Sequence, residues 1–189
     1  MTRLELTTAI AATLLAAAAM AQSTNSTDEK FLKDFAQANA AEVKAGELAS
    51  TQAQNPEVKA FGKHMMDDHS KTLTKVTEVA GKSHVDVKEK PDLMHKGKDA
   101  LLEHKDGAKF DAAYLKAQVD DHEDAVKLLQ KEVKEGQDPA VKQLASQALP
   151  VVQRHLDMAK QLQAKVAGAP SNKSSMTTRD KAEPVASTH

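Results

Sequence analysis

Residues 55–81 read NPEVKAFGKHMMDDHSKTLTKVTEVAG, and their apolar side chains recur every three or four positions. On a helical wheel these side chains form one stripe, which consists of Val58, Phe61, Met65, Leu73, Val76 and Ala80. A stripe of this kind is typical of an amphipathic helix that packs against a core. Pro56 suits the first turn of a helix and Gly81 suits its end, so the segment predicts a helix over residues 56–80. His69 lies at the centre of the stripe.

Three further segments have the same helical periodicity, and they cover residues 28–53, 108–135 and 139–167. The first two helices are joined by a very short connection, as are the last two, so each pair must form an antiparallel hairpin. Residues 81–107 join the two hairpins, are long enough to run the length of a bundle, and are predicted to carry a short helix. The predicted fold is therefore all-α, a ferritin-like four-helix bundle with one long crossover, which occupies residues 28–168.

The composition supports helices and excludes several classes of function. Alanine, lysine, glutamate and leucine are abundant among the 189 residues, aromatic residues make up 3 %, and tryptophan is absent. Such a composition favours helices over sheets. The net charge of −1 provides no overall field that would attract nucleic acid or an anionic membrane. Because cysteine is absent, the chain can form no disulfide, thiolate metal site or cysteine nucleophile.

The two ends of the chain differ from the helical part. Arg3, an apolar run over residues 9–21 and small residues just before Gln22 are typical of a secretory signal peptide, which would occupy residues 1–21. The run is too short to span a bilayer, and an ordinary N-terminal helix is the alternative. Residues 169–189 are rich in proline, serine and threonine and are predicted to be disordered. The mature chain is therefore expected in the periplasm or at the outer membrane, without a transmembrane segment.

The two predicted hairpins resemble each other in sequence. Phe31 and Phe110 each begin a segment in which an aromatic residue follows four positions later and an acidic residue, Glu42 or Asp121, follows eleven positions later. The second helices also begin alike, with NPEVKAF in one hairpin and DPAVKQL in the other. Two copies of one helical hairpin are a simple way to build a four-helix bundle.

Each predicted helix carries a polar residue on or beside its apolar face. Glu42, His69 and His155 lie in the middle of these faces. On the third helix Asp121 and His122 lie on either side of the centre, so either side chain can face inward. Counted from the predicted turns, these residues all lie at a similar depth near the middle of the bundle. A buried carboxylate is strongly unfavourable unless it is paired or binds a metal, so Glu42 needs a partner.

These residues predict a site for one transition-metal ion, with Glu42, His69, His122 and His155 as ligands and Asp121 as a further ligand or a supporting residue. Imidazole and carboxylate together suit zinc, copper, iron or manganese. A di-iron oxidase bundle needs more carboxylates. No phosphate-binding loop, G-x-S-x-G elbow or H-E-x-x-H helix is present, so an enzyme is the less favoured interpretation. The remaining histidines are given no role.

Four separated motifs carry a resemblance to a known family. They read AEVKAGELA (41–49), NPEVKAFGKHMMDDHSK (55–71), FDAAYLKAQVDDHEDAV (110–126) and DPAVKQLASQALPVVQRHLDMA (138–159). Through them, residues 28–165 resemble the bacterial family named Domain of Unknown Function 4142, whose members are secreted, ferritin-like four-helix proteins of the periplasm or outer membrane. The resemblance implies this fold and location but no activity. The acidic residue and the histidines of the family pattern fall on Glu42, His69, His122 and His155.

Two functions remain open from the sequence alone. One is a periplasmic or envelope protein that binds a metal ion and acts in metal handling or the stress response. The other is a metal-free structural or partner-binding bundle, with an unknown protein partner, in which the buried polar layer fixes the register of the helices.

Overall fold

The computed structural model describes residues 25–88, 90, 102, 105 and 107–168, and within these ranges the chain is all-α. Four helices follow one another along it, namely α1 (Ser26–Gln52), α2 (Pro56–Lys82), α4 (Gly107–Glu135) and α5 (Pro139–Gly168). Their limits differ from the predicted limits by no more than about two residues, which is the usual uncertainty of a helix end. The predicted fold class is therefore confirmed.

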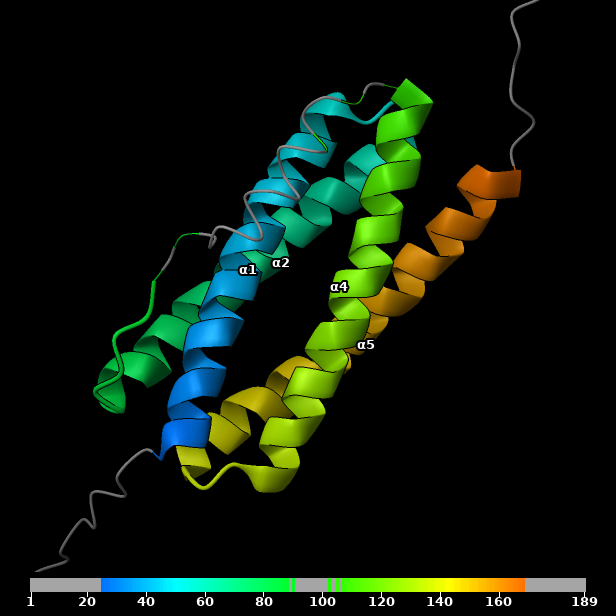
Figure 1. Cartoon of the computed structure of the whole chain (residues 1–189). Coiled ribbons are helices and arrows are strands. Elements are labelled where there is room, and N and C mark those ends of the chain that lie inside the picture. The colour runs from blue at the N-terminus through cyan, green and yellow to red at the C-terminus, as the bar shows by residue number, and fades with distance from the viewer. Residues whose placement is uncertain (1–24, 89, 91–101, 103–104, 106, 169–189) are drawn as a thin grey trace, which may run out of the picture.

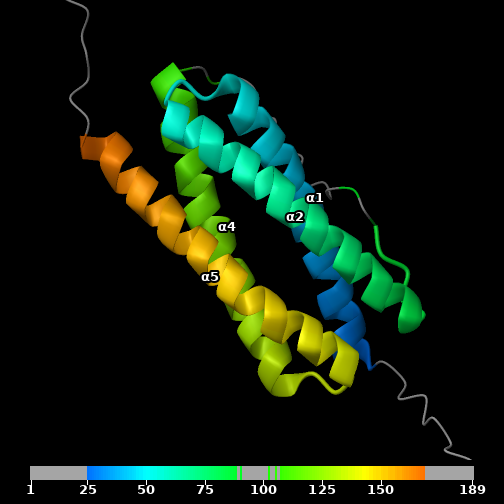
Figure 2. The ribbon, with the colours of Figure 1, turned by 180° about the vertical axis from the view of Figure 1, so that it is seen from behind.

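The helices form two hairpins, α1 with α2 and α4 with α5 (Figure 1). The hairpins lie side by side, with α1 against α4 and α2 against α5 (Figure 2). The predicted signal peptide and the predicted C-terminal tail lie outside the described residues, and so does the short helix predicted in the crossover, apart from a few residues such as the buried Leu102. None of the helices in the described part of the chain is both long enough and apolar enough to span a membrane.

Side chains at the helix starts explain where the helices begin. The Oδ1 atom of Asn25 accepts hydrogen bonds from the backbone N–H groups of Thr27 and Asp28 in the first turn of α1. Asn55 and Asp138 accept equivalent bonds at the starts of α2 and α5. Each of these two is followed by a proline, whose missing N–H group needs no partner in a first turn.

The two helices of the first hairpin approach each other closely at a pair of glycines. A Cβ atom on Gly46 would lie 2.6 Å from the carbonyl oxygen of Gly62, and a Cβ atom on Gly62 would lie 2.5 Å from the Cβ atom of Ala49. Both distances are shorter than a van der Waals contact, so the helices can be this close only because both residues lack a side chain. The close approach brings the polar residues of α1 beside His69.

Each hairpin turn is bound by an aspartate of the other hairpin. The carboxylate of Asp111, near the start of α4, accepts hydrogen bonds from the backbone N–H groups of residues 54 and 55 at 2.9 and 2.8 Å. The carboxylate of Asp28, in the first turn of α1, accepts hydrogen bonds from the backbone N–H groups of residues 137 and 138, both at 3.0 Å. We call these four bonds the reciprocal aspartate contacts.

The reciprocal aspartate contacts correct the predicted internal repeat. Asp28 and Asp111 are 83 positions apart (111 − 28), and so are the two turns to which they bind. The predicted repeat of NPEVKAF and DPAVKQL has this same spacing (138 − 55), whereas the predicted aromatic repeat has a spacing of 79 positions and differs by about one helical turn. With the spacing of 83, Asn39 of α1 corresponds to His122 of α4, and both side chains are buried.

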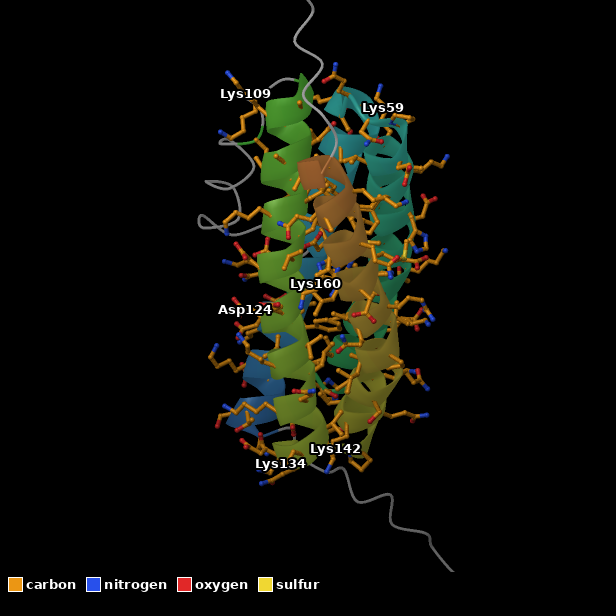
Figure 3. The ribbon with its side chains drawn as sticks, turned by 90° about the vertical axis from the view of Figure 1, so that its right-hand side faces the viewer. Lys59, Lys109, Asp124, Lys134, Lys142 and Lys160 are labelled. Carbon is orange, nitrogen blue, oxygen red and sulfur yellow. The ribbon has the colours of Figure 1, made fainter. Side chains whose placement is uncertain are left out.

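The apolar core consists of two clusters with polar residues between them. One cluster lies toward the α4–α5 turn and includes Phe35 and Leu144, whereas the other lies toward the α1–α2 turn and includes Phe61 and Tyr114. The buried polar residues near the middle of the bundle are Asn39, Glu42, His69, Gln118, His122 and His155. Charged side chains project from the outer faces of the helices (Figure 3). The polar layer is therefore enclosed by apolar packing above and below.

Candidate metal centre

Three histidines from three helices meet inside the bundle. They are His69 of α2, His122 of α4 and His155 of α5, and their exposed fractions are 5 %, 1 % and 1 %. One potential ligand nitrogen from each ring lies within 4.8 Å of the corresponding nitrogen of the other two. Two nitrogens bound to one zinc ion in tetrahedral geometry lie about 3.4 Å apart, because each Zn–N bond is about 2.1 Å long. The three rings therefore need to move by less than about 1 Å to share one ion.

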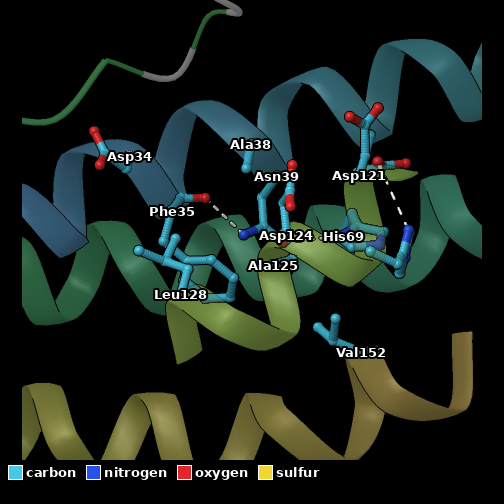
Figure 4. A pocket seen from close by; sticks show the side chains of 12 residues that line it. Asp34, Phe35, Ala38, Asn39, His69, Asp121, Asp124, Ala125, Leu128 and Val152 are labelled. Atoms are coloured by element: carbon cyan, nitrogen blue, oxygen red, sulfur yellow. Dashed lines mark hydrogen bonds and ion pairs between the residues drawn. The ribbon is translucent and has the colours of Figure 1, made fainter. Parts of the chain in front are cut away.

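Hydrogen bonds fix which nitrogen each imidazole offers. The Nδ1 atom of His69 lies 2.9 Å from Oδ1 of Asn39, and the Nδ1 atom of His122 lies 2.9 Å from the backbone oxygen of Gln118. Both oxygens can only accept, so both Nδ1 atoms must carry the hydrogen. The amide of Asn39 is oriented by its own Nδ2 atom, which donates to the backbone oxygen of Phe35 at 2.7 Å (Figure 4).

The third histidine is oriented by a carboxylate. The Nε2 atom of His155 lies 3.4 Å from Oδ2 of Asp68 and donates its hydrogen toward it. The nitrogens left over are Nε2 of His69, Nε2 of His122 and Nδ1 of His155, and all three are buried without a hydrogen-bond partner among the described residues. A histidine that donates from one nitrogen to an oxygen and offers the other nitrogen's lone pair is the usual arrangement of a metal ligand.

The pKa values of the three histidines are lowered. Burial, followed by the neighbouring His122 and His155, brings the pKa of His69 well below its usual 6.5. Burial lowers the pKa of His122 to about 4, and burial together with the charge of His122 lowers the pKa of His155 to about 4. The imidazoles are therefore neutral at neutral pH, and no proton competes with a cation for their lone pairs.

Glu42, predicted as a ligand, lies beside the three histidines. Its side chain is buried, and its Oε2 atom accepts a hydrogen bond of 2.6 Å from Nε2 of Gln118. Its Oε1 atom lies 3.9 Å from Nδ1 of His122, which is the nitrogen that carries the hydrogen. The carboxylate therefore faces the side of His122 opposite to the unpaired nitrogen, and it would have to change its rotamer to reach an ion bound there.

Asp121, the other predicted carboxylate, is half-buried, whereas its neighbour His122 faces the core. Asp121 lines a cavity of about 300 Å³ between α1 and α4, together with Glu42, His69 and His122 (Figure 4). The side chains of Phe35 and Leu128 also line this cavity. It reaches His69 and His122 but not His155, and Asp121 lies on its wall.

Sequence reasoning missed three residues that orient the histidines. Asn39 and Gln118 are buried at the same level, and Asp68 contacts His155 from the other side. The signal for Asn39 was present, because the spacing of 83 residues pairs it with His122. Asp68 lies at the edge of the apolar face of α2, where a solvated carboxylate is the ordinary interpretation.

His64 was also given no role from the sequence. Its Nε2 atom lies 3.6 Å from Oδ2 of Asp68, and its ring centroid lies 5.3 Å from that of His155. The potential ligand atoms of His64, Asp68 and His155 lie within 4.8 Å of one another. The described residues therefore contain two groups of potential metal ligands that share His155.

The comparisons with known proteins agree with this fold. Two crystal structures resemble the chain with a TM-score of 0.64 and 14 % sequence identity each. One is a DUF305 fragment from Deinococcus radiodurans, and the match covers 76 % of this chain and 99 % of that one. The other is a DUF305 protein from Streptomyces coelicolor that is described as a predicted secreted protein, with coverages of 75 % and 94 %. At this identity the similarity shows the fold alone.

No curated protein matches the chain at a significant level. A protein family described as "Domain of unknown function (DUF4142)" matches residues 13–162, which is most of the chain. This match confirms the resemblance that the four sequence motifs suggested. The chain therefore belongs to the DUF4142 family.

Proposed function

We propose that this protein binds one transition-metal ion through His69, His122 and His155. The observation that carries the proposal is the set of three buried ring nitrogens without hydrogen-bond partners, one from each histidine. A buried polar atom without a partner is unfavourable by about 1–3 kcal/mol. Three of them at one place are explained if a cation binds there, because coordination satisfies all three lone pairs at once.

A purely structural polar layer explains this arrangement less well. In such a layer the polar groups would hydrogen-bond to one another and so fix the helix register. Here the donated hydrogens point outward from the cluster, to Asn39, to the backbone of Gln118 and to Asp68. The acceptor nitrogens remain for a ligand that brings positive charge.

The ligand types narrow the choice of metal. Neutral imidazoles suit zinc, copper, nickel and iron, whereas magnesium and calcium prefer oxygen. Three protein nitrogens leave a fourth position for water or for a carboxylate that moves in. We propose Glu42 as that carboxylate after a rotamer change, and Asp121 as a supporting residue on the wall of the cavity. Zn²⁺ and Co²⁺ are the metals with which we would test the site.

The proposed role is the handling of metal ions outside the cytoplasm. The predicted signal peptide supports export, as does the similarity in fold to a protein from Streptomyces coelicolor that is described as a predicted secreted protein. An envelope protein with a neutral three-histidine site can take up an ion and release it on acidification, because protons compete with the metal. We propose no catalytic activity.

The direct test is a metal titration of the mature chain, residues 22–189, after treatment with a chelator. We expect one equivalent of Co²⁺ to bind and to give the visible absorption bands that are typical of four-coordinate Co²⁺. His69→Gln and His122→Gln should each remove this binding. His84→Gln is the matched control, because His84 is exposed and lies beyond the end of α2. If Co²⁺ and Zn²⁺ fail to bind the original chain, or bind both site variants equally well, the proposal is wrong.

A further inference from the structure

We propose that His64, Asp68 and His155 form a second, outer cation position through which the metal ion reaches the three buried histidines. This inference rests on the proposed function, since it assigns the route by which that site is filled. It depends on a separate group of residues, two of which, His64 and Asp68, do not belong to the buried triad. His155 belongs to both groups.

Exposure falls stepwise from the outer group to the inner one. The side chain of His64 is 42 % exposed, that of Asp68 is 25 % exposed, and that of His155 is 1 % exposed. His64 also lines a groove of about 330 Å³ between α2 and α5, together with Phe61, Met158 and other residues. A hydrated cation can therefore reach His64 from solvent, whereas it cannot reach the buried ring of His155 directly.

The ligand atoms of the outer group face one another. Oδ2 of Asp68 lies 3.6 Å from Nε2 of His64 and 3.4 Å from Nε2 of His155. The other carboxylate oxygen, Oδ1, is held by Nζ of Lys71 at 3.1 Å. The salt bridge with Lys71 thus orients the carboxylate so that its second oxygen points between the two imidazoles. A cation in that place would contact one anionic oxygen and the Nε2 atom of His64, and it would also contact Nε2 of His155 once the hydrogen of that ring has moved to Nδ1.

The charges of the two groups differ, and this difference gives the route a direction. The three imidazoles of the buried triad are neutral, and the Glu42 carboxylate beside them is buried away from solvent. The outer group contains a carboxylate, which attracts a divalent cation to the surface and raises its local concentration. The ring of His155 then lies next to the outer position on its Nε2 side and carries the unpaired Nδ1 nitrogen of the inner group. When the ion passes from the outer to the inner position, the hydrogen of His155 returns from Nδ1 to Nε2, where Asp68 accepts it in a hydrogen bond, and Nδ1 is left free to bind the ion.

The proposal makes a kinetic prediction that differs from the prediction for a ligand of the inner site. If His64 lies only on the route, its removal lowers the rates of binding and release by the same factor and leaves the equilibrium affinity of the inner site unchanged. If His64 were a ligand of the final ion, its removal would lower the affinity. The two cases are distinguished by measuring the association rate and the dissociation constant on the same variant.

The experiment is a stopped-flow measurement of Co²⁺ binding to the metal-free mature chain, followed by its visible absorption. We expect His64→Ala to slow binding by about tenfold, because the outer position loses one of its ligands and is occupied less often, with an unchanged dissociation constant of the inner site. His84→Ala serves as the control for the loss of an exposed histidine and should bind at the original rate. An unchanged dissociation constant also shows that the variant is folded.

The competing route is the cavity between α1 and α4, with Asp121 on its wall. If Asp121→Asn slows binding and His64→Ala does not, the ion uses that cavity and the proposal is overturned. A weakened affinity of His64→Ala at an unchanged rate would overturn it as well. Failure of the original chain to bind Co²⁺ at all would instead refute the proposed function, so the two failures are distinguishable.

Discussion

Replacing Glu132 by glutamine is predicted to stabilise the protein at alkaline pH and to have little effect at acidic pH. The side chain of Glu132 is 2 % exposed, and its Oε1 atom has no hydrogen-bond partner among the described residues. Burial, together with the hydrogen bond with Asp28 and the negative charge of Asp28, raises the pKa of this carboxyl group to about 7. Glu132 therefore binds a proton more readily in the folded chain than in the unfolded chain.

The sign of the effect follows from this difference. Between about pH 4.5 and pH 7 the folded state holds a proton that the unfolded state has lost, so the free energy of unfolding decreases as the pH rises through this window. A rise of the pKa from 4.5 to about 7 corresponds to about 3.4 kcal/mol at about 1.36 kcal/mol per pKa unit. Below about pH 4.5 both states are protonated at Glu132 and the loss disappears.

Glutamine keeps the shape of the protonated side chain and can still donate to Asp28, but it does not titrate. We therefore expect Glu132→Gln to exceed the original chain in free energy of unfolding by about 2–3 kcal/mol at pH 8 and by less than about 0.5 kcal/mol at pH 4.5. Urea unfolding at both pH values, followed by the helical circular dichroism signal in the presence of a chelator, measures this difference. Glu135→Gln is the control, because Glu135 is exposed three residues further along α4. A constant difference between the two proteins across this pH range would refute the reasoning.

Three further predictions concern the metal centre and the first hairpin. Because His69, His122 and His155 have lowered pKa values, they take up protons on unfolding, so the metal-free protein should lose stability as the pH falls from about 6.5 toward 4, measured as a falling urea midpoint; a midpoint that rises over this range would contradict this. Gly62→Ala should lower the free energy of unfolding by about 1–3 kcal/mol, because the new methyl group overlaps the backbone of α1, and thermal unfolding with no change would show that the close helix contact is absent. Asn39→Ala should weaken Zn²⁺ binding by about 10–100-fold in a competition titration, since the hydrogen bond that orients His69 is lost; an unchanged affinity would show that this bond has no part in binding.

The helices and their pairing could be predicted from the sequence because they depend on short-range patterns. The apolar stripe around His69, the prolines at the helix starts and the short turns each indicate local structure, and the short turns leave only antiparallel hairpins. The limits of α2 and α5 followed from Pro56 and Pro139, whose fixed geometry suits a first turn. These features can be recognised in the sequence without knowing how the helices pack against one another.

The details of the site could be predicted only in part, because they depend on contacts between helices. The wheel positions of His69 and His155 indicated correctly that both are buried, but periodicity alone left Asp121 and His122 as alternatives. Which of the two side chains faces the core depends on how α4 is rotated about its axis relative to α1, and no local sequence pattern specifies this rotation. The hydrogen bond from Gln118 to Glu42 could not be foreseen either, because it joins residues 76 positions apart.

The position of His64 illustrates the same limit. From the sequence it is one of several histidines beside a polar face, where solvent exposure is the ordinary expectation. Only the packing of α2 against α5 brings its ring to 5.3 Å from that of His155. Its proximity to Asp68 follows from their spacing of four residues, yet that spacing alone does not indicate a ligand group.

The reciprocal aspartate contacts have a consequence for how the molecule holds together. In each hairpin turn, two backbone N–H groups donate to an aspartate of the other hairpin. If the hairpins separate, the N–H groups of both turns lose these acceptors at the same time. Separation of the hairpins therefore breaks both pairs of hydrogen bonds, and we expect the two hairpins to unfold together in a single cooperative transition. By the same symmetry, the aspartates of one molecule could bind the turns of another, so if two chains associate at high concentration we expect them to exchange hairpins.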